Sequence, residues 1–374
     1  MMKQGKAFKD GGKFSRVFSV RMRWYIWRLK SKNSDVRRAS AYALGKIGSK
    51  EAVPHLIEAL KDKKWYVRRA AAEALGKIGS KEAVPHLAKA LKDEDRDVRR
   101  AAVQALKEIE WQPQSQEEKI LYLVAKKAWN ELVKIGTPAI PYLARELEDG
   151  DEYVRREVVE ALGEIGCKEA VPHLIKVLKY KRWWSKDDRD VRKAAAEALG
   201  KIGSKEAIPH LAEALKDIDR DVRDVREAAV NALGKIGSKE AIPYLAKALK
   251  DEDRGVRIEA AVALGKIGSK ETVPYLIKAL KDEDWYVRML AAEALGEIGS
   301  KEATPHLIEV LKDRVEDYRV REAAAKALGE IGSKEAVPHL KEVLKDGGWS
   351  VLRMLAAKAL RKIKQQSQNH EEKF

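Results

Sequence analysis

The chain has 374 residues and a formal net charge of +16, with 36% charged and 45% hydrophobic residues. Ala, Leu, Glu and Lys dominate, which is typical of long exposed helices and excludes an intrinsically disordered chain. No stretch approaches the 18 or so uninterrupted apolar residues that cross a bilayer, and the single cysteine, Cys167, excludes an intramolecular disulfide. We therefore expect a cytoplasmic protein with a packed helical core and no transmembrane segment.

The positive charge is concentrated at the N-terminus. Residues 1–38 carry twelve Lys and Arg residues against Asp10 and Asp35, a net charge of +10, which leaves +6 for the remaining 336 residues. Residues 1–15 have glycines among lysines and are predicted to be a flexible basic segment. The body has Lys and Glu at helical spacing, an ion-pair-rich pattern that would suit a thermophile.

Residues 16–30 are predicted to form a half-repeat that caps the fold. Basic and aromatic side chains replace the acidic and Ala positions of the later repeats. Such a helix could also bind nucleic acid or an anionic membrane surface by releasing counterions, so both interpretations stay open for the following residues: Arg16, Arg21, Arg23, Trp24, Trp27 and Arg28.

A repeat of about 31 residues follows and fixes the architecture. Each copy reads approximately DVRRAAAEALGKIGSKEAVPHLIEALKDED, and Val-Arg pairs recur 31 residues apart at Val36, Val67 and Val98, and again at Val225, Val256 and Val287. Repeats of this length stack as helical pairs, each packing only on its neighbours. The sequence thus predicts an all-α solenoid.

Each copy predicts two helices. One begins at an Asp such as Asp35, which can cap the first turn, and ends at Gly48 as a C-cap. The other begins near Ser49 and has Pro54 near the end of its first turn. In the first helix, apolar residues recur at helical spacing and predict a single buried stripe: Val36, Ala39, Ala43, Leu44 and Ile47.

These features resemble the HEAT-repeat family, and more closely the HEAT-like repeats first associated with phycobilisome lyases, over about residues 20–363. The family's Pro matches Pro54, Pro85, Pro172, Pro209, Pro243, Pro274, Pro305 and Pro338. Its Asp and Arg six residues apart, which pair along the solenoid, match Asp62 with Arg68, Asp93 with Arg99, Asp251 with Arg257 and Asp282 with Arg288. The resemblance implies a right-handed α-solenoid of about ten HEAT-like helical hairpins over residues 16–364, with one extra two-helix insertion.

By analogy with the family, the Val-Arg helix lines the concave surface. Its outward positions are Arg69, Glu73 and Lys77 in the second copy, but in the seventh and eighth copies they are apolar: Ile258, Val262, Met289 and Leu290. Exposed apolar patches usually mark contacts with a protein or ligand, although a wider packing seam between repeats is the alternative. We therefore predict a non-catalytic scaffold or adaptor, without a cofactor, that binds a protein partner through its concave face.

Two insertions interrupt the period. The spacing from Val98 to Val154 is 56, and the irregular segment 110–137 is predicted to form two short extra helices that act as a structural adaptor. The second insertion, residues 179–188, combines aromatic and basic residues: Tyr180, Arg182, Trp183 and Trp184. It is either a contact loop or a loop folded back on the solenoid. As a contact loop it would bind an acidic partner, single-stranded nucleic acid or a membrane. Residues 365–374 are predicted to be a disordered polar tail.

The sequence shows no catalytic motif. Six histidines share one repeat position, but stacked helices lie about 8–10 Å apart and ligands must lie within about 2.1 Å of a shared metal, so we predict no metal site. Deoxyhypusine hydroxylases of the HEAT-like type hold iron with His-Glu pairs, and the only such pair here is His370-Glu371, in the tail. A further alternative, which rests on the resemblance alone, is an accessory subunit of a chromophore lyase or similar modifying enzyme.

Overall fold

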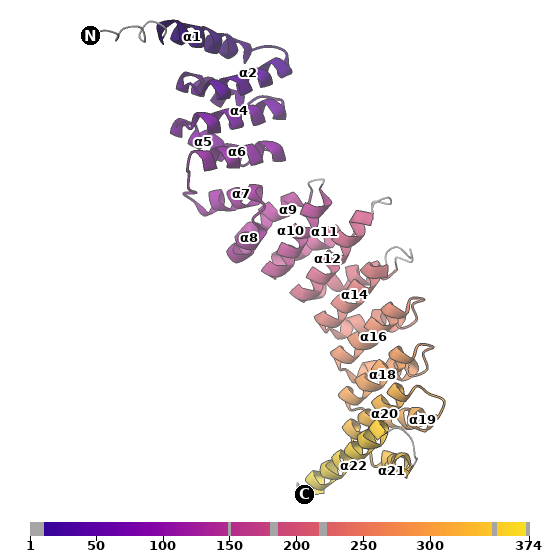
Figure 1. Cartoon of the computed structure of the whole chain (residues 1–374). Helices are drawn as coiled ribbons and strands as arrows, with labels where there is room; N and C mark the ends of the chain where they lie inside the picture. The colour runs from indigo at the N-terminus through magenta and orange to yellow at the C-terminus, as the bar shows by residue number, and fades with distance from the viewer. Residues whose placement is uncertain (1–10, 149–150, 180–185, 217–222, 346–349, 372–374) are drawn as a thin grey trace, which may run out of the picture. The chain divides into compact units, whose positions relative to one another are not determined.

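The computed structural model of the chain describes residues 11–148, 151–179, 186–216, 223–345 and 350–371. Within these ranges it contains 22 α-helices and no strand (Figure 1), so the predicted all-α solenoid is confirmed. The helices are α1 Gly11–Arg28, α2 Ser34–Ile47, α3 Val53–Ala59, α4 Trp65–Ile78, α5 Val84–Ala90, α6 Arg96–Glu108, α7 Gln116–Lys126, α8 Trp129–Ile135, α9 Ile140–Glu146, α10 Glu152–Ile165, α11 Val171–Leu178, α12 Lys186–Ile202, α13 Ile208–Ala214, α14 Arg223–Ile236, α15 Ile242–Ala248, α16 Arg254–Ile267, α17 Val273–Ala279, α18 Trp285–Ile298, α19 Thr304–Lys312, α20 Tyr318–Ile331, α21 Val337–Lys345 and α22 Ser350–Glu371.

The residues cluster into two compact units, Met1–Tyr142 and Leu143–Phe374. In the first unit, α2, α4 and α6 pack side by side (Figure 1), with α3 and α5 against them. In the second unit, the even-numbered helices from α10 to α22 pack in the same way, and the odd-numbered helices from α11 to α21 form the other layer. We call the even-numbered helices α2, α4, α6 and α10–α22 the Val-Arg helices, and the odd-numbered helices α3, α5 and α11–α21 the Pro helices.

The ends of these helices follow from local sequence. Gly48 ends α2 in the left-handed conformation with φ of 71°, as predicted. Pro54 lies in the first turn of α3, where its missing N–H costs no hydrogen bond. The N-cap prediction at Asp35 is wrong, because the cap is Asn33, whose side chain accepts hydrogen bonds from the backbone of Asp35 and Val36. Asp35 instead lies in the first turn, where the helix dipole stabilises a carboxylate.

A buried or partly buried arginine links five of the Val-Arg helices to the next repeat. The guanidinium of Arg68, which is 7% exposed, donates from Nε and Nη2 to the two carboxylate oxygens of Asp93 at 2.8 Å. Its Nη1 donates to the backbone oxygen of Asp62 at 2.9 Å. The Asp six residues before the Arg therefore contributes its carbonyl, and the paired carboxylate lies 25 residues later. The same spacing of 25 recurs as Arg37 with Asp62, Arg226 with Asp251 and Arg257 with Asp282. Arg288 pairs with Glu316, 28 residues later.

This arginine ladder changes the acidity of its carboxylates. Burial alone would raise the pKa of Asp62. Hydrogen bonds from Arg37 and from the Lys64 backbone, with the positive charges of Arg37 and Arg68, outweigh burial and lower that pKa. Because the folded pKa is below the unfolded value, the stability from this pair is present at neutral pH and is lost as the pH falls through the folded pKa.

Small residues set the distance between neighbouring Val-Arg helices. An added Cβ at Gly200 would lie 2.7 Å from the Cα of Ala232, closer than real Cβ atoms approach. The same Gly-to-Ala contact joins seven other pairs: Gly45 with Ala74, Gly76 with Ala105, Gly163 with Ala198, Gly234 with Ala263, Gly265 with Ala294, Gly296 with Ala327 and Gly329 with Ala359. The predicted apolar stripe of α2 misses this feature, because Ala39 is exposed whereas Ser40 and Gly45 are buried.

The first insertion forms the two predicted helices, α7 and α8. The residues predicted to fill their core are all buried: Leu121, Leu123, Val124, Trp129 and Leu132. At the two ends of the described chain, the helices are longer than the sequence indicates. Helix α1 begins at Gly11, inside the predicted flexible segment, and α22 continues beyond Lys364 to Glu371. Lys and Gln are good helix formers, so this part of the tail extends the helix that precedes it.

We predict that replacing Arg257 by Met lowers the free energy of unfolding by about 3–5 kcal/mol, because the side chain of Asp282, only 10% exposed, loses its cation. The control is Arg69→Met, which breaks an exposed pair with Glu73 that contributes at most about 1 kcal/mol. Urea unfolding followed by circular dichroism measures both. Equal unfolding midpoints for the two variants would contradict the role of the ladder.

We also predict that Gly200→Ala destabilises the protein by about 1–3 kcal/mol, because overpacking exceeds the gain in helix propensity. Adding Ala232→Gly should restore part of the loss, since the Cβ then moves to the other side of the contact. A double-mutant cycle measures this coupling. Strictly additive effects of the two substitutions would rule out the close contact.

Candidate functional site

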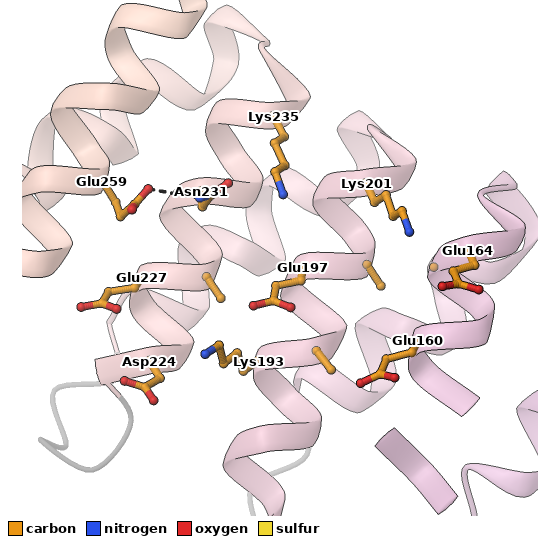
Figure 2. Close-up of a pocket in the computed structure, with 14 residues that line it drawn as sticks. Glu160, Glu164, Lys193, Glu197, Lys201, Asp224, Glu227, Asn231, Lys235 and Glu259 are labelled. Atoms are coloured by element: carbon orange, nitrogen blue, oxygen red, sulfur yellow. Dashed lines mark hydrogen bonds between the residues drawn. The ribbon is translucent and has the colours of Figure 1, made fainter. Parts of the chain in front are cut away.

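A groove of about 570 Å³ crosses four Val-Arg helices of the second unit, α10, α12, α14 and α16 (Figure 2). Its charged lining consists of six carboxylates and three lysines: Glu160, Glu164, Glu197, Asp224, Glu227, Glu259, Lys193, Lys201 and Lys235. Between them lie small residues such as Gly163, Ala194 and Ala198. The small residues that bring the helices together therefore also leave space between the longer side chains.

The lining comes from a few positions of the repeat. In α12, Lys193, Glu197 and Lys201 are the third, seventh and eleventh residues from the Val of the Val-Arg pair. The equivalent residues of α4, Arg69, Glu73 and Lys77, line a second groove of about 630 Å³ in the first unit. These are the positions predicted to point outward, and the prediction is confirmed for both helices. We call this surface of the Val-Arg helices the groove face.

Charges in the groove are less fully paired than those of the arginine ladder. The side chains of Glu164 and Glu197 make no ion pair or hydrogen bond with any residue that the structure describes, and the same holds for the side chains of Lys193, Lys201 and Lys235. Figure 2 shows these side chains extending from their helices, with one hydrogen bond drawn, from Asn231 to Glu259 at 3.1 Å. Unpaired charges at the rim of a groove remain available to a ligand.

The electrostatic balance of the groove favours a cation. Burial raises the pKa of Glu227, and the negative charges of Asp253, Asp224 and Glu259 raise it further, against the opposite effect of Arg223. Arg223 lies 3.5 Å from Glu227 but is itself half exposed. A cation placed among these carboxylates would relieve their mutual repulsion.

The four predicted apolar contact residues lie next to this groove but do not line it. Ile258 and Val262 are in α16, Met289 and Leu290 are in the neighbouring α18, and all four are partly buried. Glu259, which follows Ile258, does line the groove. A binding role for the four apolar residues remains a prediction.

Apolar replacements at the outward positions do not indicate the acidic side of the groove. Glu227 stands where other copies have Arg69 or Lys193, and Glu259 stands where α4 has Ala70. A comparison of charge sign at these positions, copy by copy, would have found both residues. The sequence therefore held a signal for the groove that hydrophobicity alone does not report.

The other predicted contact residues belong to two segments of the chain, the insertion at residues 179–188 and the N-terminal helix α1. Tyr180, Arg182, Trp183 and Trp184 fall outside the described residues. The predicted N-terminal residues are in α1, from Arg16 onward. There Arg21 and Arg23 are exposed, Trp24 and Trp27 are 47% and 72% exposed, and Arg28 is partly buried with its guanidinium 4.3 Å from the centre of the Trp24 ring.

Two other kinds of feature are absent from the described ranges. No group of three or more His, Cys, Asp or Glu side chains is arranged to hold a metal ion. No described helix is both long enough and apolar enough to span a bilayer.

Comparison with known families finds HEAT repeats along most of the chain. The family described as HEAT repeats matches residues 22–107, 122–185, 140–224, 223–284 and 273–361. No curated protein sequence matches the chain.

Three solved structures are similar to this chain. Human deoxyhypusine hydroxylase in complex with glycerol is 24% identical with a TM-score of 0.32, over 78% of this chain and 99% of that one. Kap121p is 16% identical with a TM-score of 0.46, over 94% of this chain and 46% of Kap121p. Kap121p bound to the extreme C-terminus of the protein phosphatase Cdc14p is 16% identical with a TM-score of 0.44, over 95% and 42%. This chain spans less than half of either Kap121p chain, and the likenesses concern the fold alone.

We predict that Glu227→Gln raises the melting temperature at pH 8 by about 1–2 °C and leaves it unchanged at pH 4. The folded pKa of Glu227 is raised, so the folded chain binds its proton more tightly than the unfolded chain does. Ionised Glu227 therefore costs stability above its folded pKa and none below its unfolded pKa. Thermal unfolding at both pH values, with the exposed Glu206→Gln as control, measures the effect, and a lower melting temperature at pH 8 would contradict it.

Proposed function

The chain belongs to the HEAT-repeat family, and we propose that it is a non-catalytic scaffold that binds a protein segment along the groove face of its second unit. The observation that carries this proposal is that Glu164 and Glu197, on two successive Val-Arg helices, have carboxylates with no partner among the described residues. We propose that it acts in the cytoplasm, because a chain with a single cysteine forms no intramolecular disulfide and suits a reducing compartment.

The repeat spacing supports an extended segment as the ligand. Packed helices lie about 8–10 Å apart, and an extended chain advances about 3.3 Å per residue. One repeat therefore corresponds to about three residues of a bound segment, and the four helices of the groove to about ten residues. A segment with Lys or Arg at every third position would place a cation opposite the carboxylates of each repeat.

The apolar residues next to the groove extend this surface. Ile258 and Val262 in α16 and Met289 and Leu290 in α18 are partly buried, so only part of each side chain can contact a partner. Burial of that part contributes about 25 cal/mol per Å². We propose that they bind an apolar residue beyond the end of the cationic segment.

We predict that Glu164→Lys with Glu197→Lys weakens binding of a ten-residue cationic peptide at least about tenfold, because two attractions become repulsions. The probe is a fluorescein-labelled peptide with Arg at every third position, measured by fluorescence anisotropy. The same peptide with Glu in place of Arg should not bind.

The matched control is Glu206→Lys with Glu302→Lys, which makes the same charge change at exposed residues outside the groove. It should leave affinity within about twofold at physiological salt, since exposed charges are screened beyond about 8 Å. Equal losses in both double variants, or no binding of the Arg peptide to the unmodified protein, would refute the groove as the binding site. The apolar extension is tested with the same peptide lengthened by Leu-Leu. It is supported if the longer peptide binds the unmodified protein more tightly than the shorter one does, and if Met289→Lys with Leu290→Lys removes this gain.

The resemblance to repeats of phycobilisome lyases suggests a second function, as an accessory subunit of a chromophore lyase. Its test is independent of the peptide experiment: bilin is mixed with the protein and a candidate acceptor. Fluorescence that requires the protein would favour this function over the scaffold.

A further inference from the structure

Helix α1 has two apolar faces, and only one of them is packed. Met22 is 5% exposed and lies in the hydrophobic core of the first unit, and Ile26 and Leu29 pack against that core. These three residues have the spacing i, i+4, i+7. At about 100° per residue, they therefore share one face of the helix.

The opposite face repeats the same spacing but is exposed. Val20, Trp24 and Trp27 also stand at i, i+4 and i+7, and they are 66%, 47% and 72% exposed. Their stripe lies about 200° around the helix from the core stripe. The core of the repeats therefore does not explain why two tryptophans and a valine occupy this face.

Basic side chains flank the exposed stripe on both sides. At about 100° per residue, Arg21 and Arg28 fall on one side of the stripe and Arg23 on the other, and Lys30 lies in the turn that follows α1. Arg21, Arg23 and Lys30 are exposed, and the guanidinium of Arg28 lies 4.3 Å from the ring centre of Trp24. Residues 11–34 contain seven Lys and Arg residues and no Asp or Glu.

We propose that this outer face of α1, formed by Val20, Trp24 and Trp27 with Arg21 and Arg23, docks the protein onto an anionic lipid bilayer. The helix lies in the plane of the surface, with the indole rings at the level of the headgroups, where Trp is favoured. The flanking guanidinium groups bind lipid phosphates and carboxylates on both sides of the stripe. The Arg28 guanidinium over Trp24 holds one cation beside the inserted ring.

The composition of the stripe favours a bilayer over nucleic acid. Proteins bind single-stranded nucleic acid in a positively charged groove, where aromatic rings stack on successive bases. Val20, 66% exposed, offers no ring, but it adds aliphatic surface in line with the two indoles. Continuous apolar surface between two rows of cations matches the acyl boundary and the headgroups of a bilayer.

The test is sedimentation of the full chain with vesicles of phosphatidylcholine containing about one-third phosphatidylserine, and with vesicles of phosphatidylcholine alone. The protein should bind the anionic vesicles and bind the neutral vesicles at least about tenfold less. Trp24→Ala with Trp27→Ala should reduce anionic binding at least about tenfold. The control, Trp65→Ala with Tyr153→Ala, removes two exposed aromatic residues outside α1 and should bind like the unmodified protein.

Several results would overturn the proposal. Anionic vesicles bound equally by the Trp24/Trp27 double variant, or not bound by the unmodified protein, would reject the docking face. If the unmodified protein binds a single-stranded oligonucleotide but no vesicles, and the Trp24/Trp27 variant loses this binding, the face is assigned to nucleic acid instead. A dimer that becomes a monomer in this variant, without vesicle binding, would assign it to a second copy of the chain.

Two further measurements keep these outcomes clear. Circular dichroism should be unchanged in the Trp24/Trp27 variant, since both tryptophans are exposed. A second variant, Arg21→Glu with Arg23→Glu, keeps the rings and removes the cations beside them. The groove peptide should bind the Trp24/Trp27 variant normally, because α1 is not part of the groove lining. Loss of vesicle binding with intact peptide binding therefore separates this proposal from the scaffold function.

Discussion

The arginine that links one repeat to the next, and that is buried at Arg68, Arg226 and Arg257, is the constraint on which the rest of the structure depends. A guanidinium has five donors and keeps its charge at any pH that proteins experience. Arg257 donates to the carbonyls of Asp251 and Glu252 in its own repeat and to the carboxylate of Asp282 in the next. A single repeat could supply the carbonyls but would leave the buried charge without a counterion. Stacking a second repeat is therefore required for the first to bury its arginine, and this makes neighbouring repeats depend on one another.

The Gly-to-Ala contacts impose a second constraint, and together the two constraints produce the groove face. The ladder joins one repeat to the next, whereas Gly200 against Ala232 sets how closely their helices approach. Small residues at these positions leave little side-chain volume on the surface between Glu197 and its neighbours in α10 and α14. The groove is thus a consequence of close helix packing, and the residues at its rim decide what it can bind.

Much of the fold could be predicted from the sequence because each repeat encodes it locally. The Gly48 cap, the first-turn Pro54 and the buried residues of α7 and α8 depend on short-range spacing that recurs or stands out. The partner of Arg68 could not be identified from spacing alone, since Asp62 and Asp93 both fit a repeat pattern and only the stacked structure assigns their different roles. The candidate groove was less predictable still. It gathers residues from Glu160 to Glu259, and its character depends on which charges are left without partners.

Neighbouring charged residues of one helix therefore have different roles, because one is held inside the stack and the next lines the groove. Arg226 in α14 is 2% exposed and is held by the ladder, whereas Glu227, the next residue, faces the groove with its pKa raised by burial and by neighbouring carboxylates. Because the ladder and the small-residue contacts stabilise the stack without using the outward positions, those positions can change without loss of the fold. They change from Arg69 to Glu227 to Ile258 along the chain. Differences among copies at these positions, rather than the residues that all copies share, are where the specificity of this solenoid has to lie.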